Sequence, residues 1–169
     1  MPILSAENHF RKGLVALVAG DHAQANSQFH SAILIELQRG VSHPQMRYLS
    51  YYGLTLALLH GGKAEAIRAC ETAARRDFFN PDLQFNLGKV YMISGKTTRA
   101  LSAFERGLHL APNHRGLQAE MMKVDRRRRP PLPWLGRAHP LNRYFGKLRA
   151  SLFGQRPRWN LPRRTISTT

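Results

Sequence analysis

The sequence is poor in cysteine and in long apolar runs. It has one cysteine in 169 residues, which excludes an internal disulfide framework and any zinc site built on several cysteines. No apolar stretch approaches the roughly 20 residues that a helix needs to cross a bilayer. The run GLVALVAG at 13–20 is too short to indicate a signal-peptide core. We therefore expect a cytoplasmic protein without a cleaved signal.

Acidic side chains are also scarce, and their scarcity is local. The chain has 26 Lys and Arg against 10 Asp and Glu, a net charge of +16. Residues 1–122 hold 13 basic and 9 acidic side chains, a net of +4, whereas residues 123–169 hold 13 basic ones and one acid, Asp125. The basic character therefore belongs to the C-terminal part, where it bears on partners rather than on the fold.

The motifs of common enzyme classes are missing as well. The chain has no H-E-x-x-H, G-x-S-x-G or C-x-x-C, and no two of its eight histidines have the i,i+4 spacing of a helical metal pair. The Gly61-Gly62-Lys63 segment is similar to the end of a phosphate-binding loop, but Ala57 replaces the first glycine and Ala64 the hydroxyl residue. We expect no catalysis, cofactor, metal or small-molecule substrate.

A helical pattern is clearest in residues 81–113. Apolar residues recur at helical spacing before and after Ser94-Gly95-Lys96, so the segment predicts two amphipathic helices joined by a tight turn. Pro112 ends the second helix because proline cannot continue the hydrogen-bond ladder. The order Leu87-Gly88, Tyr91, Ala100, Phe104 and Pro112 resembles one tetratricopeptide repeat.

The same landmarks occur twice more, in one phase. Counting from Gly13, the matching residues are Ala16, Gly20, Ala25, Phe29 and Ala32; counting from Gly53, they are Leu56, Ala66, Cys70 and Ala73, the last three shifted by one extra turn residue. The predicted repeats cover about 6–45, 46–80 and 81–113. Cys70 takes the place of Phe29 and Phe104, which predicts a buried packing residue rather than a reactive thiol.

Helix boundaries follow from capping residues and turn residues. We expect helices at about 6–19, 22–38, 46–59, 63–76 and on both sides of the 94–96 turn, followed by an amphipathic helix at about 113–126. Ser5, Asn80 and Asn113 are predicted to cap helices, and Pro81 suits a first helical turn.

The resemblance implies an all-α, right-handed superhelical solenoid of three tetratricopeptide repeats. We expect the repeat domain at residues 1–128, with a capping helix at about 113–128 that covers the last repeat. A Pro-rich basic tail would follow at 129–169, with an amphipathic helix at about 141–153.

The resemblance also implies a concave surface, lined by the first helix of each repeat, that binds a peptide or helix of a partner protein. The residues expected there are Phe10, Leu14, Leu17, Ser50, Tyr51, Leu54, Phe85, Asn86 and Lys89. Their apolar and aromatic character favours a hydrophobic or amphipathic ligand. The alternative is that several of them pack between repeats or against the tail.

We therefore expect a non-catalytic scaffold or adaptor. The alternative is a protein that contacts an anionic membrane surface or nucleic acid through residues 123–169, with the repeats as a spacer. The tail residues of that alternative are Arg126, Arg127, Arg128, Arg129, Arg143, Lys147 and Arg149. A third interpretation has the apolar stripe of 141–153 dock on the last repeat.

Overall fold

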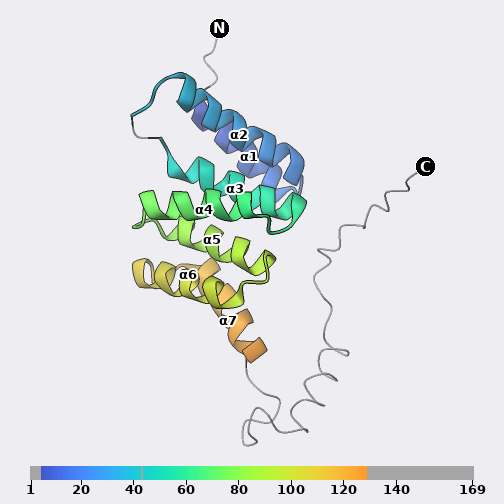
Figure 1. The fold of residues 1–169 in the computed structure, drawn as a ribbon, viewed down its shortest axis with the longest axis vertical. Helices are drawn as coiled ribbons and strands as arrows, with labels where there is room; N and C mark the ends of the chain where they lie inside the picture. The colour runs from blue at the N-terminus through green and yellow to red at the C-terminus, as the bar shows by residue number, and fades with distance from the viewer. Residues whose placement is uncertain (1–4, 43, 129–169) are drawn as a thin grey trace, which may run out of the picture. The chain divides into compact units, whose positions relative to one another are not determined.

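The computed structural model describes residues 5–42 and 44–128, with side chains described up to residue 124. This part of the chain forms helices only. They are α1 (Ala6–Val18), α2 (His22–Gln38), α3 (Met46–His60), α4 (Ala64–Arg76), α5 (Pro81–Ile93), α6 (Thr97–Leu110) and α7 (Arg115–Arg128). The predicted all-α class is confirmed, and the helix bounds lie within about two residues of those expected (Figure 1). The predicted tail helix at 141–153 lies outside the described residues.

The capping residues explain where the helices start. Ser5 accepts a hydrogen bond from the Asn8 backbone N–H, and Asn80 accepts one from the Asp82 N–H just before Pro81. The prediction for Asn113 is wrong. His114 caps α7 instead, because its Nδ1 accepts from the Leu117 N–H at 3.0 Å and its carbonyl oxygen accepts from the Gln118 N–H.

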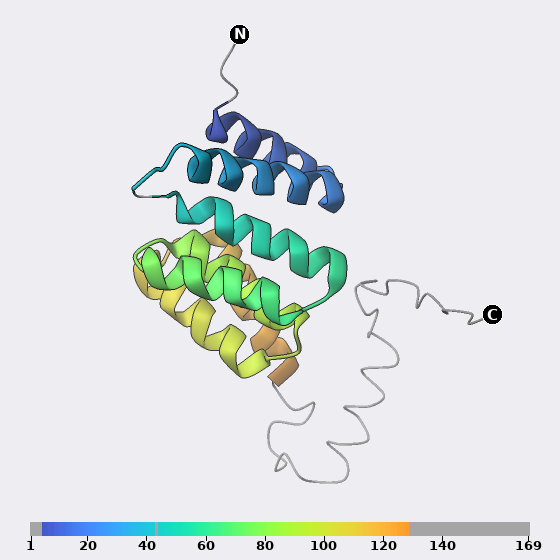
Figure 2. The same cartoon turned by 45° about the horizontal axis from the view of Figure 1, so that its top comes forward.

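Consecutive helices pair into hairpins, and the hairpins stack. Helices α1 and α2, α3 and α4, and α5 and α6 pack pairwise; α3 also contacts α2 and α5, and α4 contacts α5. Figures 1 and 2 show the three hairpins following one another in chain order. The chain's contacts divide it between Lys123 and Val124, inside α7, and the packing described below is that of the part up to Lys123.

The glycines that set the repeat phase face the second helix of their own hairpin. A Cβ added to Gly13 would lie 2.6 Å from a ring carbon of Phe29, and a Cβ added to Gly88 would lie 2.2 Å from a ring carbon of Phe104. Both rings are fully buried. The absence of a side chain on the first helix therefore lets the aromatic ring of the second helix fill the interface.

Helix α7 closes the stack of hairpins. The Leu117 side chain is fully buried. A Cβ added to Gly107 of α6 would lie only 2.7 Å from Cδ1 of Leu117, so the leucine packs directly on this glycine. This is the position expected for a capping helix that covers the apolar side of the last repeat. In the described parts, 5–42 and 44–128, no helix has the length and apolar character needed to span a bilayer. The same residues contain no cluster of side chains suited to a metal ion.

Candidate functional site

The first helices of the hairpins, α1, α3 and α5, form one continuous surface with the start of α7, called here the A-helix face. Side chains along it link α1 to α3 and α5 to the residue before α7. Glu7 of α1 pairs with Arg47 of α3 at 2.5 Å, and Asp82 of α5 contacts His114 before α7 at 3.0 Å. This is the surface on which the predicted partner-binding residues were placed.

Four of those nine residues are buried beneath the face: Phe10, Ser50, Leu54 and Asn86. Phe10 belongs to an aromatic cluster between the first two hairpins, with its ring centroid 5.5 Å from that of Phe29, 5.0 Å from that of Tyr48 and 5.3 Å from that of Tyr51. Because these rings close the interface between hairpins, Phe10 acts as core and is not available to a partner.

Ser50 and Asn86 form a buried polar link between α3 and α5. The Asn86 Nδ2 donates to Ser50 Oγ at 3.2 Å, and the Ser50 carbonyl accepts from Cys70 Sγ at 3.3 Å. Buried amides and hydroxyls are stable only with such partners. The hydrogen bond of Asn86 therefore links the second hairpin to the third. The buried position predicted for Cys70 is confirmed. Burial raises the pKa of its thiol to about 12.

The other five predicted residues, Leu14, Leu17, Tyr51, Phe85 and Lys89, are partly exposed. Lys89 extends its Nζ over the Phe85 ring, 5.2 Å from the centroid, in a cation–π arrangement. Burial lowers the pKa of Lys89, and the charge of Lys123 lowers it further against the opposing effect of Glu120. This end of the face therefore offers an aromatic ring beside an ammonium group that is less strongly hydrated than usual.

His114 supports the Phe85 ring from the other side. The two ring centroids are 5.4 Å apart. Because Nδ1 of His114 accepts the Leu117 N–H, the proton of the neutral imidazole sits on Nε2, which donates to Asp82. The histidine thus joins a cap, an aromatic contact and a hydrogen bond, which fixes the start of α7 against α5.

An ion-pair network on the same face was missed in the sequence. Glu7 accepts from Arg11, Arg47 and the Tyr48 hydroxyl. Burial raises the pKa of Glu7, but the hydrogen bonds from Arg11 and Tyr48 and the charge of Arg47 outweigh it and leave the pKa below its usual value. The signal was available, because Glu7, Arg47 and Asp82 each stand six residues before the phase-setting glycine of their repeat.

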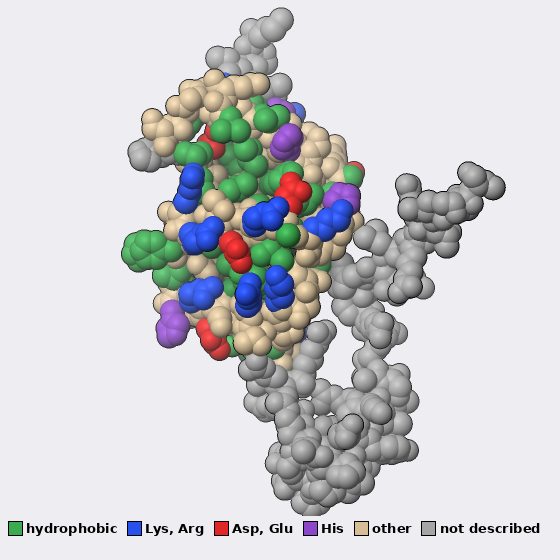
Figure 3. All heavy atoms as spheres, in the orientation of Figure 1, with side chains coloured by type: hydrophobic (Ala, Val, Ile, Leu, Met, Phe, Trp, Pro, Cys, Tyr) green, Lys and Arg blue, Asp and Glu red, His purple; other side chains and the backbone are tan. Residues whose placement is uncertain are grey.

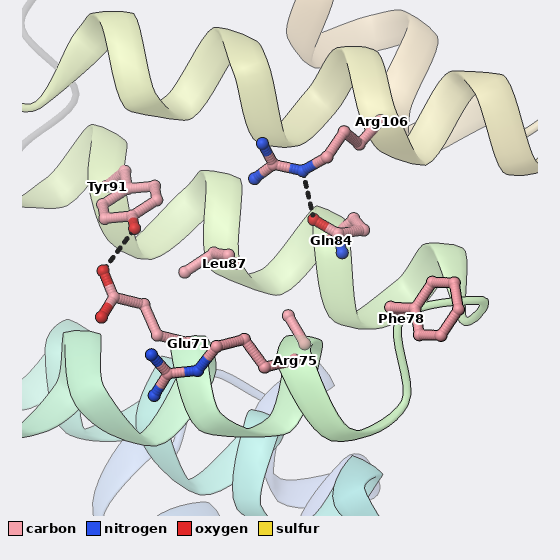
Figure 4. A pocket seen from close by; sticks show the side chains of 8 residues that line it. Glu71, Arg75, Phe78, Gln84, Leu87, Tyr91 and Arg106 are labelled. Carbon is pink, nitrogen blue, oxygen red and sulfur yellow. Dashed lines mark hydrogen bonds between the residues drawn. The ribbon is translucent and has the colours of Figure 1, made fainter.

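A second site lies between the second and third hairpins and was also missed. It is an open pocket of about 480 Å³ lined by Glu71, Ala74 and Arg75 of α4, Phe78 of the α4–α5 connection, Gln84, Leu87 and Tyr91 of α5, and Arg106 of α6 (Figure 4). On α5 it uses the stripe 84, 87 and 91, whereas the A-helix face uses 82, 85 and 89. The two sites therefore share one helix and use different sides of it.

Two polar contacts order the pocket wall. Tyr91 donates its hydroxyl proton to Glu71 Oε1 at 2.5 Å, and Arg106 Nε donates to Gln84 Oε1 at 3.3 Å (Figure 4). Burial, followed by the hydrogen bond to the Glu71 carboxylate, raises the pKa of Tyr91 to about 12. The tyrosine is therefore a permanent donor at neutral pH, and Glu71 is already held by it.

The fold defines a class: stacked helical hairpins whose first helices carry partly exposed side chains. Residues 81–114 match the tetratricopeptide repeat family model. Among solved structures, the Arabidopsis OM64 TPR domain is similar, with a TM-score of 0.59 and 16% sequence identity over 72% of this chain and 95% of that one. That likeness shows the fold alone. No curated protein matches the chain in sequence.

Residues 81–114 thus form a tetratricopeptide repeat, and the hairpins before it share the fold of a tetratricopeptide repeat domain. This fold is generally a non-catalytic module that mediates contacts between proteins. A shared fold does not fix a function, so the function of this chain depends on the geometry of its own surfaces.

Proposed function

We propose that the protein is a non-catalytic adaptor that binds a peptide or amphipathic helix of a partner protein on the A-helix face. The observation that supports this most is that Leu14, Leu17, Tyr51, Phe85 and Lys89, on three successive first helices, keep partly exposed side chains. The residues buried beneath them fix their positions, so the surface is prepared before a ligand arrives.

The chemistry of the face suggests an amphipathic ligand. Two half-buried leucines on α1 and the Phe85 ring supply apolar contact, while Lys89 and the Glu7–Arg47 pair supply charges along the same surface. Apolar anchors with charges beside them suit a helix or extended segment laid along the stack.

The proposal is tested by affinity capture from cell extract with the intact chain and with a Leu17→Asp/Lys89→Glu variant. The control is Arg68→Glu/Glu105→Lys, which exchanges exposed charges on α4 and α6. Proteins that the intact chain and the control retain, and that the A-helix-face variant loses, support the proposal. Identical capture by all three forms argues against it.

The basic C-terminal part supplies the alternative function. Its 13 Lys and Arg against one acid favour contact with an anionic membrane surface or with nucleic acid. Co-sedimentation with anionic liposomes, with an RNA of matched charge as the control, compares the intact chain with a form that ends at residue 128. Binding that disappears with residues 129–169 and is unaffected by the A-helix-face variant favours this alternative over the adaptor.

A further inference from the structure

The pocket between the second and third hairpins has an apolar base that no function proposed above uses. Ala74 and Leu87 are buried at its floor, and the Tyr91 ring forms part of its wall. Its volume of about 480 Å³ lies in the range of pockets that hold ligands.

The rim of the pocket carries an exposed aromatic pair. Phe78 lines the pocket with 56% of its surface exposed, and Phe79 beside it is 70% exposed. Their ring centroids are 3.9 Å apart, so the two rings support each other in the connection between α4 and α5. A pair of exposed phenylalanines in mutual contact beside a pocket marks an apolar contact surface.

Positive charge surrounds this apolar base. Lys and Arg side chains gather over α4, α5 and α6 in Figure 3, with few acids among them. Arg75 and Arg106 line the pocket itself, and among the described residues neither forms an ion pair with a carboxylate. The one acid of the lining, Glu71, is held by Tyr91.

Arginine is suited to binding a carboxylate in this setting. A guanidinium presents a planar fork of donors that matches the two oxygens of a carboxylate. Arg106 is fixed by its Nε on Gln84, which leaves its terminal nitrogens to a ligand. Two guanidinium groups from different helices therefore flank an apolar base.

We propose that this pocket binds a short segment of a partner protein in which an acidic residue stands next to a bulky apolar one. The apolar side chain packs on Ala74 and Leu87 against the Phe78 ring, and the carboxylate lies between Arg75 and Arg106. The site is separate from the A-helix face, so the protein has two binding surfaces and can join two partners.

Charge complementarity selects this occupant over two others. The chain's own residues 123–169 carry 13 basic side chains and one acid, so they have the wrong sign for a pocket lined by two arginines that pair with no carboxylate among the described residues. A nucleic acid would bring a row of phosphates past the Glu71 carboxylate, and it has no aliphatic group for the apolar floor. A segment that combines one or two acids with an apolar side chain satisfies both parts of the site.

The experiment is a selection of a phage-displayed random decapeptide library on the immobilised intact chain. Enriched peptides are then synthesised with a fluorescent label, and their affinity for the full chain is measured by fluorescence anisotropy. We expect a consensus with Asp or Glu next to Phe, Leu or Trp. Exchanging its acids for amides should weaken binding at least about tenfold, because charge-assisted hydrogen bonds are lost.

The protein variants locate the site. Arg75→Glu/Arg106→Glu should weaken the selected peptides at least about tenfold, and Phe78→Ser should weaken them as well. The matched control is Arg68→Glu/Arg76→Glu, which makes the same change in net charge at two exposed arginines of α4 that do not line the pocket. It should bind almost as tightly as the intact chain. Unchanged circular dichroism melts show that each variant is folded.

Three results would overturn the proposal. The first is a library that enriches no acidic–apolar consensus. The second is equal weakening by the lining variant and its matched control, which would indicate only general attraction to a basic surface. The third is an RNA oligonucleotide that binds as tightly as the peptides and is equally sensitive to Arg75→Glu/Arg106→Glu.

Discussion

In the third hairpin, the ring of Phe104 fills the space that a side chain on Gly88 would need. A Cβ on Gly88 would stand 2.2 Å from Cε1 of the fully buried Phe104 ring, a distance that no real Cβ contact shows. The glycine is therefore required by the ring rather than by its own backbone conformation, which is helical.

This pair predicts the effect of adding one methyl group. Gly88→Ala should lower the free energy of unfolding by about 1–3 kcal/mol, since overpacking outweighs the helix propensity gained, about 1 kcal/mol. The measurement is chemical denaturation followed by circular dichroism. Ala119→Leu, an exposed change on α7, is the control and should stay within about 0.5 kcal/mol. An unchanged Gly88→Ala variant would contradict the packing.

A second prediction separates core from binding surface on the A-helix face. Phe10→Ala should cost about 3–5 kcal/mol of stability, because the ring is buried among Phe29, Tyr48 and Tyr51. Leu17→Ala, at a partly exposed position of the same helix, should cost much less. Thermal denaturation of both variants makes the comparison, and equal losses would argue against the division of the face.

The buried link between Ser50 and Asn86 supplies a third prediction. Ser50→Ala leaves the Asn86 amide without its partner and should cost about 1–3 kcal/mol. The stability lost in the double variant Ser50→Ala/Asn86→Leu should be smaller than the sum of the losses in the two single variants. Urea denaturation of the double-mutant cycle measures the coupling, and strict additivity would show that the hydrogen bond contributes nothing.

The fourth prediction concerns alkaline pH. The pKa of Tyr91 rises from 10.0 to about 12 on folding, so the native state holds its proton more tightly than the unfolded state. The resulting stability is present below about pH 10 and lost as the pH rises toward about 12. Tyr91→Phe should cost about 1 kcal/mol at pH 7 through the lost hydrogen bond to Glu71. The difference from the intact protein should shrink above pH 10; a constant difference would contradict the shift.

The fifth prediction concerns the thiol. Cys70 is fully buried, its Sγ donates to the Ser50 carbonyl, and burial raises its pKa to about 12. At pH 8 it should react with a disulfide reagent only as fast as the protein opens, and rapidly in denaturant. Colorimetric labelling with and without guanidinium chloride checks this. Fast labelling of the native protein would place the thiol at the surface.

The helices could be predicted from the sequence because each one carries its own signals: apolar spacing, capping residues, glycine turns and Pro81. The repeat phase gave the close approach of Gly13 and Gly88 to Phe29 and Phe104 for the same reason. These features depend on neighbours in the same hairpin, which sequence spacing describes well.

The sites were harder because they depend on contacts between hairpins. Leu14, Leu54 and Lys89 each follow the phase-setting glycine of their repeat, yet Leu54 is buried and the other two are half-exposed. The burial of this position depends on how the next first helix packs over it. The pocket needs Arg75 and Arg106 from two different hairpins, and no repeat landmark governs either position. Only the stacking geometry brings them together.

In the middle hairpin, Cys70 and the backbone of α4 pack against the glycine of the first helix, where an aromatic ring does so in the other two hairpins. There, a Cβ on Gly53 would meet not only Cys70 Sγ at 2.7 Å but also the Ala66 backbone oxygen at 2.9 Å. The neighbouring backbone itself takes the room, and a backbone cannot swing aside as a ring can. Substituting the family's customary phenylalanine at position 70, a standard move in consensus engineering, should therefore weaken this protein, although that residue suits both neighbouring hairpins.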